Sequence, residues 1–131
     1  MKPGLRKHAR FAVKWPVTYL NEGLSGEGTV LDISQVGCQV EGTLAVTVGM
    51  LLKLLILPPH KEEKLCVEEG RVLWVKEGAF ALELQRLPPT DHRWLLRFLE
   101  NAERRNSYRT LDKPSIIEDL AAKPLTLPLN E

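Results

Sequence analysis

Alternation of apolar and polar residues dominates the first two thirds of this chain, and it limits what the chain can fold into. Between Phe11 and Tyr19 every second residue is large and apolar. This period of two is typical of a β-strand with one buried face. Five further segments downstream show related patterns, and we expect a strand in each, the fifth being long and interrupted. Their pattern-forming residues are Thr29, Leu31 and Ile33; Cys38 and Val40; Leu52, Leu54 and Ile56; Leu65, Val67, Val72 and Trp74; and Phe80, Leu82 and Leu84.

Glycine, proline and asparagine mark the places where these strands should end or bend. Pro16 cannot donate a backbone hydrogen bond, which predicts an edge strand or a bulge at that point. Residues 21–26 predict a turn-rich loop, and residues 34–37 predict a break between the second and third strands. Gly70 predicts a bulge in the fifth strand, and residues 76–78 predict a tight hairpin leading to the sixth.

The period changes after Pro88, where apolar residues recur at helical spacing. Thr90 is a candidate N-cap, and Asp91 is favourable near the positive end of a helix dipole. The apolar stripe consists of Trp94, Leu95, Phe98, Leu99 and Ala102. Six short strands joined by turns usually close into a small barrel. We therefore predict an all-β fold with one C-terminal helix: a six-stranded antiparallel β-barrel whose helix covers one end or an edge.

Composition narrows the class of protein. The chain has 131 residues, of which 44% are hydrophobic, so it suits one domain with a real core. A net charge of +1 predicts no bulk attraction to a nucleic-acid polymer or an anionic membrane. Cys38 and Cys66 lack metal-ligand spacing, and we expect free thiols in a reducing cytoplasm. The longest apolar run, residues 50–57, is too short for a membrane span, and the N-terminus does not look like a signal peptide. Trp15, Trp74 and Trp94 lie on predicted apolar faces, which favours a place in the core for all three.

Two short polar segments carry the functional signal. Arg6 and Arg10 stand four residues apart in a basic N-terminal stretch. A guanidinium group binds phosphate bidentately, grips the O6/N7 edge of guanine or stacks on a purine. Asp32, Ser34 and Gly37 follow at the end of the second predicted strand. A carboxylate accepts from the N1–H and N2–H2 donors of guanine, a hydroxyl donates and accepts, and glycine allows a sharp, close turn. Together the segments predict a receptor for an anionic guanine nucleotide.

These two motifs, in this order and ahead of a barrel pattern and a terminal helix, resemble the PilZ domain. The paired arginines match R-x-x-x-R, the second segment matches D-x-S-x-x-G, and residues 70–75 with 78–84 look like the last hairpin of the family. The resemblance covers roughly residues 5–105, which is the length of one domain. It implies a bacterial receptor for cyclic di-GMP that needs no cofactor and no metal.

The resemblance also implies roles for individual residues. Arg6 and Arg10 would contact the phosphates and the Hoogsteen edges of guanine. Asp32, Ser34 and Gly37 would line the pocket around one guanine.

Leu5, Lys7 and His8 are auxiliary candidates beside the arginines. Leu5 stands where the family associates the residue with binding of one ligand or of an intercalated pair. Leucine adds no third guanidinium, so the resemblance favours one cyclic di-GMP per domain. Lys2, Lys7 and His8 would reverse this expectation if they supplied the missing charge.

Domain organisation follows from these assignments. We expect residues 1–10 to form a mobile, basic ligand-binding arm and residues 11–105 to form the barrel with its helix. Residues 106–131 would be a tail, with a short helix around 115–122. Ligand binding would order the arm and change a surface that an effector protein, acting in trans, reads. The sequence does not identify this effector, the downstream process or the oligomeric state.

Other classes of function have less support in the sequence. The alternative to a ligand-dependent regulator is a PilZ-like protein–protein interaction module that does not depend on ligand. Proteins that bind single-stranded nucleic acid interleave basic and aromatic residues along their strands, whereas the strand aromatics here lie on apolar faces. We expect no enzyme, because no nucleophile–histidine pair, carboxylate pair or metal-ligand set is evident.

Overall fold

The computed structural model of the chain describes residues 9–43, 45–59 and 61–105. Within this part of the chain, six strands are followed by one helix. In chain order they are β1 (Phe11–Asn21), β2 (Leu24–Ile33), β3 (Gly37–Gly42), β4 (Leu51–Ile56), β5 (Leu65–Lys76), β6 (Ala79–Arg86) and α1 (Pro89–Arg105). The predicted tail at 106–131, with its short helix around 115–122, lies outside the described residues.

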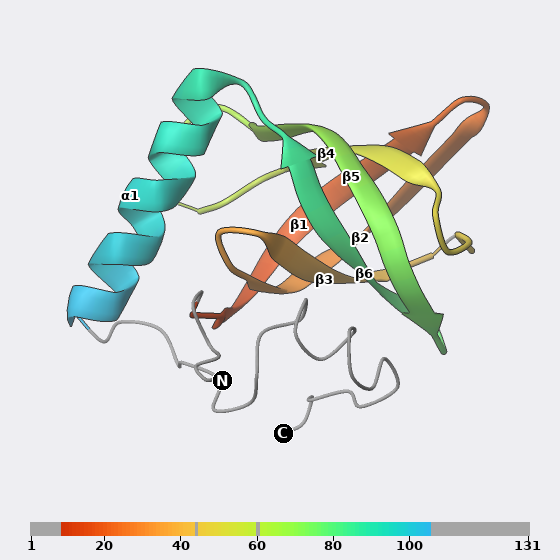
Figure 1. The fold of residues 1–131 in the computed structure, drawn as a ribbon, viewed down its shortest axis with the longest axis horizontal. Helices are drawn as coiled ribbons and strands as arrows, with labels where there is room; N and C mark the ends of the chain where they lie inside the picture. The colour runs from red at the N-terminus through yellow and green to blue at the C-terminus, as the bar shows by residue number, and fades with distance from the viewer. Residues whose placement is uncertain (1–8, 44, 60, 106–131) are drawn as a thin grey trace.

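The six strands form a closed barrel in the order β1-β2-β3-β6-β5-β4. Every neighbouring pair is antiparallel, and β4 closes the barrel by pairing with β1, where Val17 lies opposite Ile56. Figure 1 shows α1 lying across one end of this barrel, while the β1–β2 hairpin points away from the helix. The predicted six-stranded antiparallel barrel with one C-terminal helix is therefore confirmed.

Alternating apolar residues of the strands fill the barrel interior. Along β1 the buried residues are Phe11, Val13, Trp15, Val17 and Tyr19. The helix contributes its own apolar stripe to the same core, with Leu95 fully buried. The ring centroid of Trp15 lies 4.9 Å from that of Phe98 and 6.2 Å from that of Trp94, both edge to face. Such pairs add about 0.5–1.5 kcal/mol beyond burial, so aromatic packing helps to hold α1 against the open end of the barrel.

The first hairpin is tighter than the sequence predicts. Instead of a loop over residues 21–26, the chain turns in two residues and β2 begins at Leu24. Gly26 does not break β2, which continues past it. A side chain at Gly26, or at Gly42 where β3 ends, would collide with the ring of Tyr19, so both glycines make room for this large buried ring.

The helix also begins earlier than predicted. Thr90 lies inside the first turn of α1 and is not the N-cap. The carbonyl of Pro88 accepts a hydrogen bond of 2.9 Å from the amide four residues later, so Pro88 occupies the capping position. Pro89 takes the first helical position, where a missing N–H costs nothing. Asp91 instead ties the helix to β5, since its Oδ2 accepts from the N–H of Cys66 at 2.6 Å.

Two predicted irregularities are present. The pairing of β5 with β6 shifts register between Glu69 and Gly70, which confirms the bulge predicted at this glycine. Lys76 pairs with Ala79, and the two residues between them, Glu77 and Gly78, have φ angles of 49° and 85°. Two successive positive φ angles are typical of the tight turns that join twisted antiparallel strands, so the predicted hairpin is confirmed.

Pro16 does not lie on an edge strand, because β1 pairs with both β2 and β4 in the closed barrel. The register shift of β1 falls just before it, between Ala12 and Trp15. The carbonyl of Pro16 accepts from the N–H of Leu57 at 2.8 Å, one position beyond the end of β4. The side of Pro16 that lacks an N–H therefore faces the end of the β1–β4 ladder, where it interrupts little of the pairing.

Replacing Gly28 by alanine should destabilise the barrel. A Cβ at Gly28 would meet the carbonyl oxygen of Glu41 and the Cα of Gly42, which are backbone atoms of the paired strand. Backbone cannot move aside cheaply, so we expect Gly28→Ala to lower the free energy of unfolding by about 1–3 kcal/mol. Gly70→Ala is the matched control, because the nearest atom to its added Cβ is a leucine side-chain carbon at 3.4 Å. Equal unfolding free energies for the two variants in urea titrations would contradict this account.

Candidate functional site

The turn between β2 and β3 is built around the side chain of Ser34. Its hydroxyl accepts hydrogen bonds from the N–H groups of Val36 at 3.2 Å and Gly37 at 3.1 Å, and it donates to the carbonyl of Gly37 at 3.3 Å. The N–H of Ser34 donates to the same carbonyl at 2.8 Å. Ser34 is fully buried. Its hydroxyl therefore holds the shape of the turn, and this is the local role that the structure gives it.

Gly37 begins β3 and is buried beside β6, where its Cα partner is Glu83. The described residues with left-handed φ angles are Gly23, Gly49, Glu77 and Gly78. Gly37 is not among them, so it does not supply a left-handed conformation. The sharp turn that the sequence predicts is held instead by the hydrogen bonds of Ser34.

The start of β1 brings Arg10 and Asp32 to the same face of the barrel wall. Phe11 pairs with Ile33, and both fill the barrel interior. Ala12 pairs with Asp32, so strand alternation places these two on the outer face, together with Arg10. Diagonal neighbours on one face of a sheet are about 7–8 Å apart, which a long side chain spans. Both charged residues are buried, with Arg10 0% and Asp32 2% exposed.

The burial of Arg10 differs from the expectation that residues 1–10 form a mobile arm. Arg10 directly precedes Phe11, which is anchored in the core, so its backbone is fixed by β1. A buried charge is costly unless opposite charge or hydrogen bonds compensate it. Such a residue is part of the barrel wall and not of a solvated terminus. The other proposed arm residues Leu5, Arg6, Lys7 and His8 lie outside the described residues, and their roles stay predictions.

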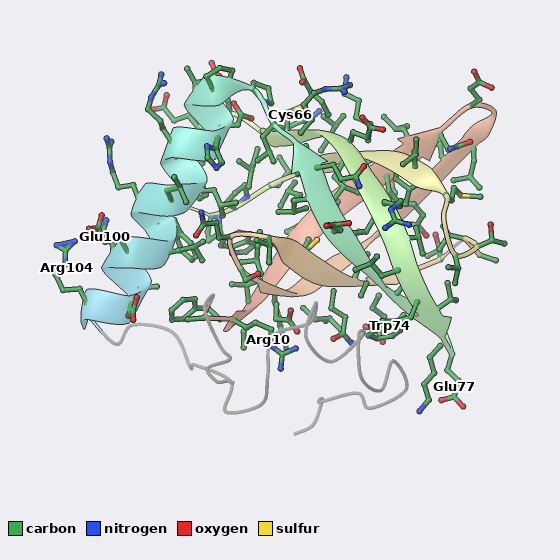
Figure 2. All side chains as sticks on the ribbon, viewed as in Figure 1. Arg10, Cys66, Trp74, Glu77, Glu100 and Arg104 are labelled. Carbon is green, nitrogen blue, oxygen red and sulfur yellow. The ribbon has the colours of Figure 1, made fainter. Side chains whose placement is uncertain are left out.

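A line of outward-facing residues crosses the barrel wall from β1 to β5, and we call it the outer row. In order of pairing its members are Ala12, Asp32, Gln39, Ala81 and Trp74. Trp74 and Ala81 form an apolar cluster separate from the main core, as expected for residues on the opposite face of the wall. Figure 2 shows Arg10 and Trp74 on the same side of the barrel. Four members of the outer row are nonetheless buried: Asp32, Gln39, Ala81 and Trp74.

Trp74 is buried, as the sequence predicts, but it lies in a small cluster with Ala81 and not in the main core. Val72 pairs with Leu82 inside the barrel, but the register then shifts, and Trp74 pairs with Ala81 on the outside. A bulge adds one residue and so reverses which face the following side chains occupy. Trp15 is buried in the core as expected, and Trp94 packs partly buried against it.

Gln39 is a candidate site residue that the sequence reasoning missed. It is 1% exposed, and its Cα lies directly opposite that of Asp32 in the β2–β3 pairing. Alternation with Cys38 and Val40, which are core residues, would have assigned it to the outer face.

Burial raises the pKa of the Cys38 thiol well above its usual range, and the negative charge of Asp32 adds to the shift. This thiol is therefore an inert core group.

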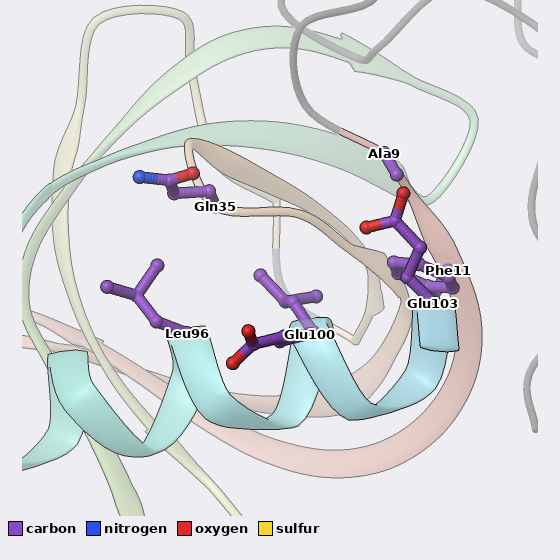
Figure 3. A pocket seen from close by; sticks show the side chains of 7 residues that line it. Ala9, Phe11, Gln35, Leu96, Glu100 and Glu103 are labelled. Atoms are coloured by element: carbon purple, nitrogen blue, oxygen red, sulfur yellow. The ribbon is translucent and has the colours of Figure 1, made fainter. Parts of the chain in front are cut away.

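A separate pocket of about 210 Å³ lies between α1 and the β2–β3 turn (Figure 3). Its lining residues are Ala9, Phe11, Gln35, Leu96, Leu99, Glu100 and Glu103. Small-molecule sites usually measure about 300–1,000 Å³, and the carboxylates of Glu100 and Glu103 would repel phosphate. This pocket does not suit an anionic dinucleotide, whereas the outer row with Arg10 offers a cation and guanine-compatible acceptors.

Comparison with known proteins identifies the family to which this protein belongs. The PilZ domain family matches residues 4–101, which is most of the chain, and the chain belongs to this family. PilZ domains are binding and regulatory modules, and the family is one of cyclic di-GMP receptors. The matched region contains both motifs found in the sequence. No curated protein is matched.

Solved structures agree with the family. The chain is similar to the Bacillus subtilis inhibitor of motility, MotI/DgrA, with a TM-score of 0.64 and 21% identity over 80% of this chain and 57% of that one. It therefore spans little more than half the length of that structure. It is also similar to the PilZ domain of CeSA from a cellulose-synthesizing bacterium, with a TM-score of 0.56 and 17% identity over 72% of this chain and 97% of that one. At these identities the likeness shows the fold.

Two further observations concern the described residues alone. They include no helix with both the length and the apolar character needed to cross a bilayer. They also contain no group of three or more His, Cys, Asp or Glu side chains arranged to hold a metal ion.

The structural role of Ser34 is testable by removing its hydroxyl. Ser34→Ala would leave the N–H groups of Val36 and Gly37 without this acceptor, and a buried unsatisfied group costs about 1–3 kcal/mol. We expect the free energy of unfolding to fall by that amount in denaturant titrations. Ser25→Ala, at an exposed position of β2, should change it by less than about 0.5 kcal/mol. A Ser34→Ala variant as stable as the wild type would show that the turn does not need the hydroxyl.

Proposed function

We propose that this protein is a regulatory receptor that binds cyclic di-GMP on the outer face of the barrel, beside the β2–β3 turn. The observation that carries the proposal is the placement of Arg10 and Asp32 as buried neighbours on one face. The family assignment supports the same ligand, because both residues belong to the motifs by which the chain resembles PilZ domains.

The chemistry of the two side chains suits this ligand. The carboxylate of Asp32 offers two oxygens to the N1–H and N2–H2 donors of guanine. The guanidinium of Arg10 presents planar paired donors that match a phosphate or the O6/N7 edge of guanine. Charge-assisted hydrogen bonds of this kind are stronger where water is excluded, as it is around these buried groups. Ser34 and Gly37 would contribute by fixing the turn on which Asp32 ends.

The regulatory step would follow from where Arg10 lies in the chain. It stands immediately before β1, so a ligand held by Arg10 and Asp32 also reaches the segment that carries Arg6. We propose that binding orders this segment against the barrel through Arg6, and that an effector protein reads the altered surface. Lys7 is an additional cation on the same segment, His8 is an additional hydrogen-bonding group there, and Leu5 favours one ligand per domain.

Calorimetric titration of cyclic di-GMP tests the proposal. Truncating a residue that pairs with a desolvated phosphate costs about 2–5 kcal/mol, which corresponds to a roughly 30-fold to several-thousand-fold weaker affinity. We expect Arg6→Ala and Arg10→Ala each to fall in this range, and Asp32→Ala to weaken binding because it removes charge-assisted hydrogen bonds to guanine. Arg93→Ala, at an exposed position of α1, serves as the control and should bind as the wild type does.

The same titrations separate the alternatives. Cyclic di-GMP should bind at one molecule per chain, with GTP and cyclic di-AMP binding far more weakly. Wild-type affinity in the Arg10→Ala variant would count against the proposed site. No binding of cyclic di-GMP to the wild type in equilibrium dialysis would favour the ligand-independent interaction module instead.

A further inference from the structure

The outer row contains a buried hydrogen-bonding group that the protein itself does not satisfy. The Oε1 atom of Gln39 has no hydrogen-bond partner among the described residues, although the residue is 1% exposed. The Nε1 atom of Trp74, two strands away in the same row, is likewise buried and unpartnered. An acceptor and a donor are thus left unsatisfied on either side of Ala81.

Burying these polar atoms without hydrogen-bond partners costs free energy of folding, so their retention points to a role other than stability. A buried amide oxygen without a partner loses its hydration and gains nothing in return. The neighbour of Gln39 across β6 in the outer row is Ala81, which is buried and apolar, so an apolar residue of the same shape would suit a purely structural position better. An unsatisfied buried polar group in a native protein calls for an explanation, and a functional site is one place where such groups are expected.

We infer that Gln39 is a base-specificity residue which accepts a hydrogen bond from the exocyclic amine of guanine. The inference rests on the proposed function, because it places the base beside Asp32. Gln39 and Asp32 are directly opposed across β2 and β3 on the outer face, where side chains of such a pair are about 4.5–5.5 Å apart at Cβ. Two neighbouring acceptors can therefore meet neighbouring donors of one base.

The donor count of guanine explains why two acceptors are useful. The carboxylate of Asp32 takes the N1–H and one hydrogen of the N2 amine. The second hydrogen of that amine points away from the carboxylate, and Oε1 of Gln39 accepts it. Adenine has no amine at C2 and carries an acceptor at N1, and hypoxanthine keeps N1–H and O6 but lacks the amine. Gln39 would thus distinguish a base that carries the C2 amine from a base that lacks it.

The sharpest probe is a pair of ligands that differ only in this amine, cyclic di-GMP and cyclic di-IMP. Wild-type protein should bind cyclic di-GMP more tightly, since cyclic di-IMP leaves both Gln39 and one oxygen of Asp32 unpaired. Gln39→Met keeps the shape and removes the acceptor, so the preference, measured as the ratio of the two dissociation constants, should fall about tenfold. Gln85→Met, at an exposed position of β6, should leave the ratio unchanged.

A second measurement distinguishes recognition from a structural role. If Gln39 is retained for the ligand, Gln39→Met relieves an unsatisfied buried oxygen, and the melting temperature of the ligand-free protein should rise by about a few degrees. Weaker discrimination together with higher stability would support the inference. A lower melting temperature with both ligands weakened equally would overturn it, as would an unchanged ratio. Wild-type protein that binds neither ligand would instead overturn the proposed function as well.

Discussion

The pairing register of β1 with β2 is the constraint on which the site depends. Phe11 and Ile33 are directly opposed and buried in the core, and this places Arg10 and Asp32 together on the outside. A slip of one residue would exchange the two faces of a strand and turn one of the charged groups into the barrel interior. The hydrophobic core therefore fixes the register, and the register in turn fixes the geometry of the polar groups.

Much of the fold could be predicted because it follows from the local periodicity of apolar residues. A period of two gave the strands, its change after Pro88 indicated the helix, and Gly70 and Gly78 marked a bulge and a turn. The errors arose where the role of a residue depends on its contact with a residue far away in the sequence. Gly26 was expected in a loop, yet it lies within β2, and together with Gly42 it accommodates the ring of Tyr19. That requirement becomes visible only when the strands are paired.

The residues of the candidate site likewise fall into those that could be predicted from the sequence and those that could not. Arg10, Asp32 and Ser34 were identifiable because they belong to short motifs, although the structure gives Ser34 to the turn itself. Gln39 and Trp74 belong to no motif. Their place in the outer row depends on pairings across β3, β6 and β5, including a register shift that reverses the face of Trp74. A single sequence contains no direct signal for such a shift.

Closure of the barrel has a consequence for how other molecules can recognise this protein. Each strand, β1 through β6, is hydrogen-bonded to a neighbour on both sides. Open sheets offer a free margin to which an incoming peptide can add a strand through main-chain hydrogen bonds. In this barrel only parts of strands are left unpaired on one side, such as β1 before Val17 and β5 after Arg71. A peptide that adds a strand would find short margins here, so side chains, loops and the helix that covers one end offer a partner more of the surface than backbone pairing does.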